Sequence, residues 1–267
     1  MRFLLVSWMI ASACSGFSQS SVEENQLEGY SYFLQGYDDS TASITQGTGF
    51  FVSRQGAVQF VTARHLLTGC HFNGTRNSNT PDEMQVYFCE DSGFRFHFTS
   101  LPTRQIQDTA LCEEYYLSPD VIACPVADSL PPGIRTLDAF LPGLLPEKKG
   151  RIVFFGYPSY NNMDSGIYSV KPAVKTAISD YRLYKSFQFK NARGEMVTDT
   201  INYTIRTAGR LASTRLKGFS GSPVFMQDLD TLRWQFIGLL IAVDEKNSLL
   251  SVVKPEYLLG KIGYGIN

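Results

Sequence analysis

The chain has 267 residues and a net charge of −1, from 24 basic and 25 acidic side chains. This balance provides no basic field that would attract nucleic acid or an anionic membrane surface. A hydrophobic content of 43%, with 14 Tyr, 19 Phe and 22 Gly in many short alternating runs, favours strands and turns over helices. The length exceeds that of most domains with one core and predicts two small packed units.

The N-terminal stretch has the pattern of a secretory signal peptide. Arg2 is followed by an apolar stretch and then by small residues up to Gln19. The apolar part is too short and too interrupted to span a membrane as a helix. We therefore expect residues 1–19 to be a signal peptide and the protein to be secreted or periplasmic. Cleavage before Cys14 also fits, but Ala11 is a poor match to the aliphatic residue that precedes a lipid-anchored cysteine.

A β-hairpin is predicted over the next informative stretch. Gly47–Val52 and Phe60–Ala63 are apolar runs, and the turn at Arg54–Gly56 separates them. The second run ends in small residues and leads directly to His65. The hairpin therefore predicts an imidazole held at the end of a strand.

The chain has three histidines, and only one of them has this placement. His71 falls in a polar loop, and His97 alternates with aromatic residues as a strand residue would. His65 is therefore the candidate general base, since such a group must be positioned within reach of a nucleophile.

Four cysteines follow the signal-like stretch, all of them before residue 130: Cys70, Cys89, Cys112 and Cys124. An even number in an exported protein suggests two disulfides. Cys112 and Cys124 flank a hairpin-like stretch, so we expect them to pair and Cys70 to pair with Cys89. The alternative is four buried free thiols.

Prolines, glycines and charges between residues 128 and 150 predict a linker. We expect an N-terminal domain at 28–130, a linker at 131–150 and a C-terminal domain at 151–267. A short helix is predicted at Pro255–Lys261, close to the end of the chain.

Gly218–Pro223, with the sequence Gly-Phe-Ser-Gly-Ser-Pro, holds a serine in a tight glycine turn before an apolar strand. Such a turn exposes the Ser220 hydroxyl as a nucleophile. Gly218 allows the N–H groups of residues 218 and 220 to point at one position, where they could stabilise an oxyanion. A structural turn is the alternative, because glycine and serine also favour turns for conformational reasons.

Together, Gly47–Val52, Val61–His65 and Gly218–Pro223 resemble the signatures of chymotrypsin-fold serine endopeptidases, closest to the bacterial trypsin-like type. The resemblance covers about residues 45 to 255. It implies an all-β fold of two six-stranded antiparallel Greek-key barrels with a short C-terminal helix. It also implies catalytic residues in the order His, Asp, Ser, an order that subtilisins and α/β-hydrolases do not share.

The resemblance requires an aspartate between His65 and Ser220, at the start of an apolar strand. Asp120 and Asp108 both open such a stretch. The family's aspartate usually precedes an aliphatic residue, and Val121 fits this better than Thr109. We therefore assign Asp120, with Asp108 as the alternative.

The resemblance also identifies a candidate substrate cleft, with Thr214, Leu240, Ile241, Ala242 and Val243 as its residues. Thr214 lies near the family's pocket floor and carries no charge, so we expect small or medium apolar side chains before the cut bond. The aliphatic run at 241–243 departs from the small, polar run that is common in the family. Phe219 also departs, since zymogen-activated relatives carry an aspartate there that binds the new N-terminus.

The function implied is that of an exported serine endopeptidase. His65, Asp120 and Ser220 would form the catalytic triad, Gly218 and Ser220 would donate the oxyanion-hole N–H groups, and an acyl-enzyme would form. The substrate would be a peptide or protein, and neither a metal nor an organic cofactor is needed. The alternatives are a catalytically silent binding module of the same fold and an exported esterase with the same triad.

Overall fold

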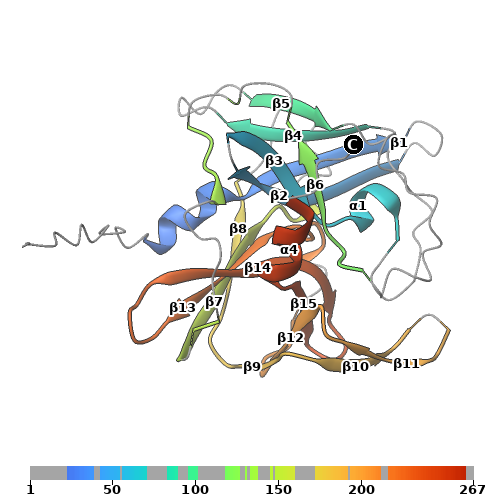
Figure 1. Cartoon of the computed structure of the whole chain (residues 1–267), viewed down its shortest axis with the longest axis vertical. Helices are drawn as coiled ribbons and strands as arrows, with labels where there is room; N and C mark the ends of the chain where they lie inside the picture. Colours follow the sequence, from blue (N-terminus) through green and yellow to red (C-terminus); the bar gives the residue numbers. More distant parts are fainter. Residues whose placement is uncertain are drawn as a thin grey trace, which may run out of the picture.

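The structure is a computed structural model of the whole chain. It describes residues 23–38, 43–54, 56–70, 83–89, 96–101, 118–126, 130, 133–137, 145–146, 148–159, 172–191, 193–211 and 216–262. Two antiparallel β-sheets dominate it, one above the other in Figure 1, and each sheet is strongly curled. The predicted all-β, two-barrel class is confirmed.

The first sheet is built from the N-terminal half of the chain. Its strands are β1 (Tyr32–Asp38), β2 (Ser43–Arg54), β3 (Ala57–Thr62), β4 (Glu83–Cys89), β5 (Phe96–Leu101) and β6 (Ile122–Pro125). They lie in the order β5-β4-β1-β2-β3-β6, and the pairing of each with its neighbour is antiparallel. The predicted hairpin is confirmed as β2–β3, with Arg54 paired to Ala57. Gly56 adopts φ 83° in its turn, a conformation that glycine tolerates best.

The second sheet is built from the C-terminal half. Its strands are β7 (Lys149–Gly156), β8 (Val174–Ile178), β9 (Tyr181–Tyr184), β12 (Asn202–Thr207), β13 (Pro223–Asp228), β14 (Trp234–Asp244) and β15 (Leu249–Val253). Their order is β8-β7-β13-β14-β15-β12-β9. The edge strands β8 and β9 are separated by only residues 179–180, so the sheet must curl until its two edges meet.

The prediction of six strands in the second unit is wrong by one strand. The short break at 179–180 divides one extended segment into β8, which pairs with β7, and β9, which pairs with β12. An additional two-stranded hairpin, β10 (Phe187–Lys190) and β11 (Met196–Asp199), follows β9 and lies outside both sheets.

Three short helices complete the described chain: η1 (Glu24–Tyr30), α1 (His65–Thr68) and α4 (Pro255–Ile262). The predicted C-terminal helix is confirmed as α4, which packs against β6 of the first sheet and β14 of the second. No helix in the described ranges is long and apolar enough to cross a membrane.

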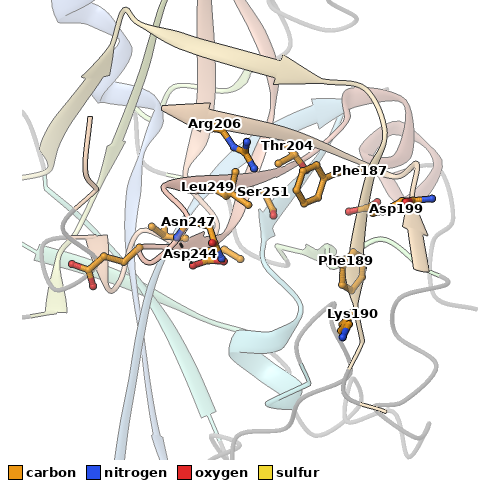
Figure 2. Close-up of a pocket in the computed structure, with 14 residues that line it drawn as sticks. Phe187, Phe189, Lys190, Asp199, Thr204, Arg206, Asp244, Asn247, Leu249 and Ser251 are labelled. Atoms are coloured by element: carbon orange, nitrogen blue, oxygen red, sulfur yellow. Dashed lines mark hydrogen bonds between the residues drawn. The ribbon is translucent and has the colours of Figure 1, made fainter. Parts of the chain in front are cut away.

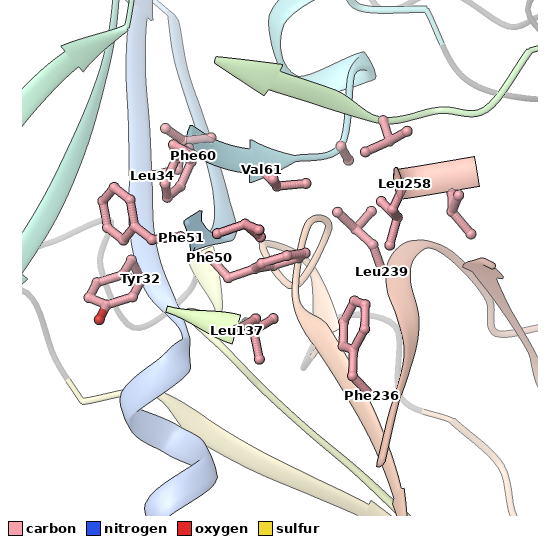
Figure 3. Close-up of a cluster of buried hydrophobic side chains, with 14 of the residues drawn as sticks. Tyr32, Leu34, Phe50, Phe51, Phe60, Val61, Leu137, Phe236, Leu239 and Leu258 are labelled. Carbon is pink, nitrogen blue, oxygen red and sulfur yellow. The ribbon is translucent and has the colours of Figure 1, made fainter. Parts of the chain in front are cut away.

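An apolar core joins the two sheets (Figure 3). Phe50 of β2 meets Phe236 of β14 edge to face, with ring centroids 5.5 Å apart, and both side chains are fully buried. Leu258 of α4 closes the same cluster. Each large apolar side chain buried here stabilises the fold by about 1.5–3 kcal/mol. The core therefore fixes β2 against β14.

The sheets use separate stretches of chain, with β6 ending at Pro125 and β7 beginning at Lys149. Between them, Thr136 forms a bridge with Phe51, and Leu137 is buried in the shared core. This part of the predicted linker thus packs against the first sheet. The exact boundaries at 130 and 150 stay predictions.

The state of Cys124 contradicts one of the two predicted disulfides. Its side chain is fully buried and its thiol is free, so the Cys112–Cys124 pair is wrong. Burial raises the pKa of this thiol to about 12, which keeps it protonated and unreactive. The side chain of Cys89 lies outside the described residues, and so does Cys112, so the Cys70–Cys89 pair stays a prediction.

Candidate active site

His65 stands where the hairpin strand β3 gives way to helix α1. Its ring Nδ1 lies 2.7 Å from Oδ2 of Asp120, and its backbone N–H donates to Oδ1 of the same carboxylate at 2.9 Å. Both residues are buried, with exposed fractions of 6% and 1%. A carboxylate is an acceptor, so Nδ1 carries the proton and Nε2 is left as the basic nitrogen.

Asp120 reaches this position because β6 pairs with β3. Thr62 lies opposite Ile122, so the residues just before β6 lie beside those just after β3. Burial alone would raise the pKa of the Asp120 carboxyl, but the charge of His65, its two hydrogen bonds and the charge of Arg64 outweigh burial and lower it. The carboxylate is therefore ionised while buried.

Ser220 lies in the predicted glycine turn, and its side chain is half-buried. Gly218 and Gly221 on either side adopt φ values of 99° and 92°. The Ser220 hydroxyl donates a long hydrogen bond of 3.5 Å to the carbonyl of Ile241 in β14. Two backbone hydrogen bonds anchor the turn to Leu240. The N–H of Gly221 donates to the Leu240 carbonyl at 2.7 Å, and the N–H of Leu240 donates to the Ser222 carbonyl at 2.9 Å.

The peptide planes of the turn have fixed orientations. The carbonyl of Lys217 accepts from the N–H of Ser159 at 2.8 Å, and the carbonyl of Phe219 accepts from Ser222 at 2.9 Å. In a trans peptide the N–H points opposite to the carbonyl, so these bonds also fix the N–H groups of Gly218 and Ser220. Within the described residues, the N–H of Ser220 donates to no carbonyl, unlike that of Phe219.

The turn docks on the strands that carry His65. The carbonyl of Ser220 accepts from the N–H of Thr48 in β2 at 2.9 Å. A Cβ on Gly221 would collide with the carbonyl of Thr48 and come within 2.5 Å of the Thr62 hydroxyl, which is three residues before His65. Glycine at 221 is what permits this close approach between the two sheets.

The described residues of the predicted substrate cleft fall into two groups. The side chains of Leu240 and Ile241 are buried in the apolar cores, whereas Ala242 and Val243 are half-buried and line a cavity. Thr214 lies outside the described residues, as do Asp108 and His71. His97 lies in β5, as predicted for a strand residue.

The cavity has a volume of about 710 Å³ and lies between the hairpin β10–β11 and the sheet (Figure 2). It is lined from β10, β11, β12, β14 and β15 by Phe187, Gln188, Phe189, Lys190, Asp199, Thr204, Arg206, Ala242, Val243, Asp244, Glu245, Asn247, Leu249 and Ser251. The hairpin's part in this cavity was not predicted from the sequence. The alternation of Phe187 and Phe189 with polar residues was the available signal.

Thr48 is a further residue of the site that was not predicted from the sequence. It lies within the Gly47–Val52 motif, is fully buried and contacts the Ser220 turn. Nothing in the sequence pattern alone indicates which partner its hydroxyl contacts. Among the described residues, no cluster of His, Cys, Asp and Glu could hold a metal ion.

Comparison with known proteins identifies the fold. No protein-family model matches the chain, and no curated protein matches its sequence. Among solved structures, the chain is similar to the active form of the Rv3671c protease from M. tuberculosis, with 20% identity and a TM-score of 0.50 over 90% of this chain and 84% of that one.

Two further similarities have lower TM-scores. One is to a Glu endopeptidase, with 14% identity and a TM-score of 0.48 over 91% of this chain and 96% of that one. The other is to tobacco etch virus protease, with 15% identity and a TM-score of 0.45 over 91% and 88%. With two curled antiparallel sheets and the similarity to the M. tuberculosis protease, the chain has the two-barrel fold of the chymotrypsin-like serine proteases.

Proposed function

We propose that this protein is a serine peptidase. The observation that carries the proposal is the buried pair of His65 and Asp120, joined by a 2.7 Å bond between the ring and the carboxylate. A buried, ionised carboxylate that orients an imidazole is how a general base is prepared for catalysis. The half-buried Ser220 supplies the hydroxyl, in a turn docked on β2, the hairpin partner of the strand that leads to His65.

The chemistry is acyl transfer in two stages. The Ser220 oxygen forms a bond to the peptide carbonyl carbon while Nε2 of His65 takes the hydroxyl proton. The N–H groups of Gly218 and Ser220 bind the resulting oxyanion. The bond to nitrogen then breaks, His65 gives its proton to the leaving amine, and water releases the acyl group by the same steps. Asp120 keeps the ring in the required tautomer throughout.

The peptide would bind along β14. Beyond Leu240, the edge of this strand that faces away from β15 pairs with no strand in the described part of the chain. An extended peptide can add to such an edge through backbone hydrogen bonds. The Ile241 carbonyl, which contacts the Ser220 hydroxyl, marks where this edge meets the nucleophile.

Export and a Cys70–Cys89 disulfide belong to the same proposal. The signal-like pattern at 1–19 supports export, and an oxidising compartment would allow the disulfide to persist. Cys124 takes no part in it, since its thiol is free and buried.

Hydrolysis of casein and of a short-chain ester by the signal-free protein tests the proposal, with Ser220→Ala as the matched control. We expect casein cleavage that the substitution abolishes. Ester hydrolysis without casein cleavage would instead indicate an esterase, and no Ser220-dependent hydrolysis of either would indicate a silent binding module. Both of these results would overturn the peptidase proposal.

A further inference from the structure

The cavity beside β14 has a floor of small side chains. The strand registers place Thr204, Ser251 and Ala242 in one row across β12, β15 and β14. Residues paired across strands share a face of the sheet, so these three short side chains leave a hollow on it. The next row along the same face consists of the larger Arg206, Leu249 and Asp244, which also line the cavity.

The hairpin β10–β11 provides an aromatic roof over this hollow. Phe187 and Phe189 are half-buried and alternate with the exposed Gln188 and Lys190, so the two rings share one face of β10. Figure 2 shows both rings on the hairpin strand, with Leu249 and Ser251 to their left. The cavity thus has aromatic and aliphatic side chains in its walls and hydroxyls at its floor, while Lys190, Arg206 and Glu245 add charged groups to its lining.

The acidic groups at the cavity wall already have partners. The Asp244 carboxylate accepts from the backbone and side chain of Asn247, at 3.1 and 2.6 Å. The Asp199 carboxylate accepts from the N–H groups of Ile201 and Asn202, at 2.9 and 3.0 Å. A cationic ligand would therefore have to compete with existing bonds, which disfavours it relative to an apolar one.

The cavity begins one residue along β14 from the strand position that contacts the proposed nucleophile. Ala242, in its floor, directly follows Ile241, whose carbonyl contacts the Ser220 hydroxyl. A peptide bound along this end of β14 would therefore place a side chain in the cavity.

We propose that the cavity is a specificity pocket for an aromatic side chain of the substrate peptide, larger than the small or medium apolar side chain expected from the sequence, with Phe187 and Phe189 as its specificity-determining residues. The inference rests on the proposed peptidase function, because it identifies the occupant as a peptide bound next to Ser220. Its volume of about 710 Å³ is in the range of pockets that bury a bulky group. Stacked or edge-to-face contact with the two rings favours an aromatic ring over an aliphatic group.

Peptide binding to the Ser220→Ala protein tests the pocket without requiring catalysis. An immobilised peptide library should show enrichment of Phe, Tyr or Trp at one position. Adding Phe187→Ala and Phe189→Ala should remove that enrichment and weaken binding of the best peptide about tenfold or more. The control is Thr198→Ala, on the exposed face of the same hairpin, which should change neither.

The outcomes separate this inference from the peptidase proposal. Aromatic enrichment that survives the double substitution, or enrichment of another residue class, overturns the pocket. Aromatic binding that depends on the two rings, in a protein that hydrolyses no peptide, overturns the peptidase function and leaves the pocket standing.

A second inference rests on different contacts, those of Thr48. Its hydroxyl donates to the Gly218 carbonyl at 2.9 Å and accepts from the N–H of Tyr157 at 3.2 Å. Its N–H donates to the Ser220 carbonyl at 2.9 Å, and its own carbonyl accepts from the Thr62 hydroxyl at 2.7 Å. One fully buried residue of the first sheet therefore holds two carbonyls of the turn in the second.

We infer that Thr48 is a positioning residue for the oxyanion hole. Gly218 lies at φ 99°, where backbone rotation is easy, and the Thr48 hydroxyl fixes its carbonyl. The N–H of Phe219 in the same peptide donates to the Leu216 carbonyl at 3.1 Å, so loss of the Thr48 bond would release the carbonyl side of the plane between the two proposed N–H donors. A misplacement of about 1 Å can cost about 10²-fold in rate.

Thr48→Val removes the hydroxyl at nearly constant shape, and Thr48→Ser restores it. We expect kcat to fall about 10²-fold in the valine variant with KM little changed. The affinity for a peptide aldehyde, which forms a tetrahedral adduct, should fall in parallel. Serine should recover most of both, and Thr45→Val, in the same strand, should change neither.

If Thr48 had only a structural role, its substitution would lower the stability of the fold without the parallel loss of kcat and aldehyde affinity. An unchanged kcat in Thr48→Val, or a serine variant as impaired as the valine one, would overturn the assignment. Aldehyde affinity that holds while kcat falls would also contradict it.

Discussion

Asp120 has both carboxylate oxygens engaged by one residue. Oδ1 accepts from the backbone N–H of His65 and Oδ2 faces ring Nδ1. The carboxylate thus fixes both the position of the backbone and the tautomer of the ring. An amide at this position can satisfy only one of these contacts as an acceptor, since its nitrogen is a donor.

Asp120→Asn should therefore leave the fold intact and lower turnover by about 10⁴-fold, because the imidazole is then held in the wrong tautomer. Asp108→Asn is the control and should change turnover little. Steady-state rates of both variants on the same peptide decide the assignment. The opposite order of effects would move the triad to Asp108.

The lowered pKa of Asp120 also predicts an acid dependence of stability. Between the native pKa and the unfolded value of about 3.9, the unfolded chain binds more protons, so stability is lost as the pH falls through this window. Denaturant unfolding of the wild type below about pH 4 should thus show a steeper loss than that of Asp120→Asn. Parallel curves would indicate that the carboxyl titrates normally in the folded protein.

For single residues, the sequence predicted those whose role follows from the type and order of their neighbours in the chain. Asp120 could be chosen because Val121 after it marks a buried strand, and the structure places it against His65. The Cys112–Cys124 pairing was wrong because a cysteine count carries no distances. The contacts of Thr48 could not be predicted, since they depend on how the two sheets meet.

Among the structural elements, we expect the glycine turn around Ser220 to tolerate substitution least. Gly221 combines φ 92° with a site where a Cβ would collide with the Thr48 carbonyl. Gly56 has a similar φ of 83° but open space around its Cβ position. Comparing alanine substitutions at Gly56 and Gly221 therefore separates the free-energy cost of the left-handed backbone from that of the collision of the Cβ with Thr48.

Gly56→Ala should lower the free energy of unfolding by about 1 kcal/mol, since only the left-handed conformation is penalised. Gly221→Ala should cost several times more and should also abolish turnover, because the turn must leave the first sheet. Denaturant unfolding and peptide hydrolysis measure the two effects. Equal costs at both positions would show that the close approach at 221 is not needed.

Elements with a local signal were predicted, and those that depend on the sheet as a whole were not. The β2–β3 hairpin and α4 follow from turn residues and apolar runs in the sequence. The break between β8 and β9 divides one extended segment only because the second sheet closes on itself there. The alternation in β10 indicates a strand with one apolar face, but the position of the hairpin β10–β11 over the cavity depends on how the chain folds back on the sheet.

For the whole molecule, Phe219 determines how the site is assembled. Its side chain is fully buried and packs edge to face on Phe154, with ring centroids 5.8 Å apart. Gly156 makes room for it, because a Cβ there would collide with the ring. An apolar contact within the second core thus holds the residue before Ser220.

The signal-free protein should consequently be active without an internal cut. The measurement is peptide hydrolysis by freshly purified, intact protein, with its mass checked before and after the assay. Treatment with trypsin should not increase the rate. An inert intact protein that a single defined cut activates would contradict this account of maturation.

Covalent labelling by a fluorophosphonate tests whether Ser220 is the nucleophile, since the reagent reacts with activated serines. We expect one adduct, located at Ser220 by peptide mapping, absent from Ser220→Ala and formed orders of magnitude more slowly in His65→Ala. No adduct on the wild type, or one that persists in Ser220→Ala, would contradict this role of Ser220.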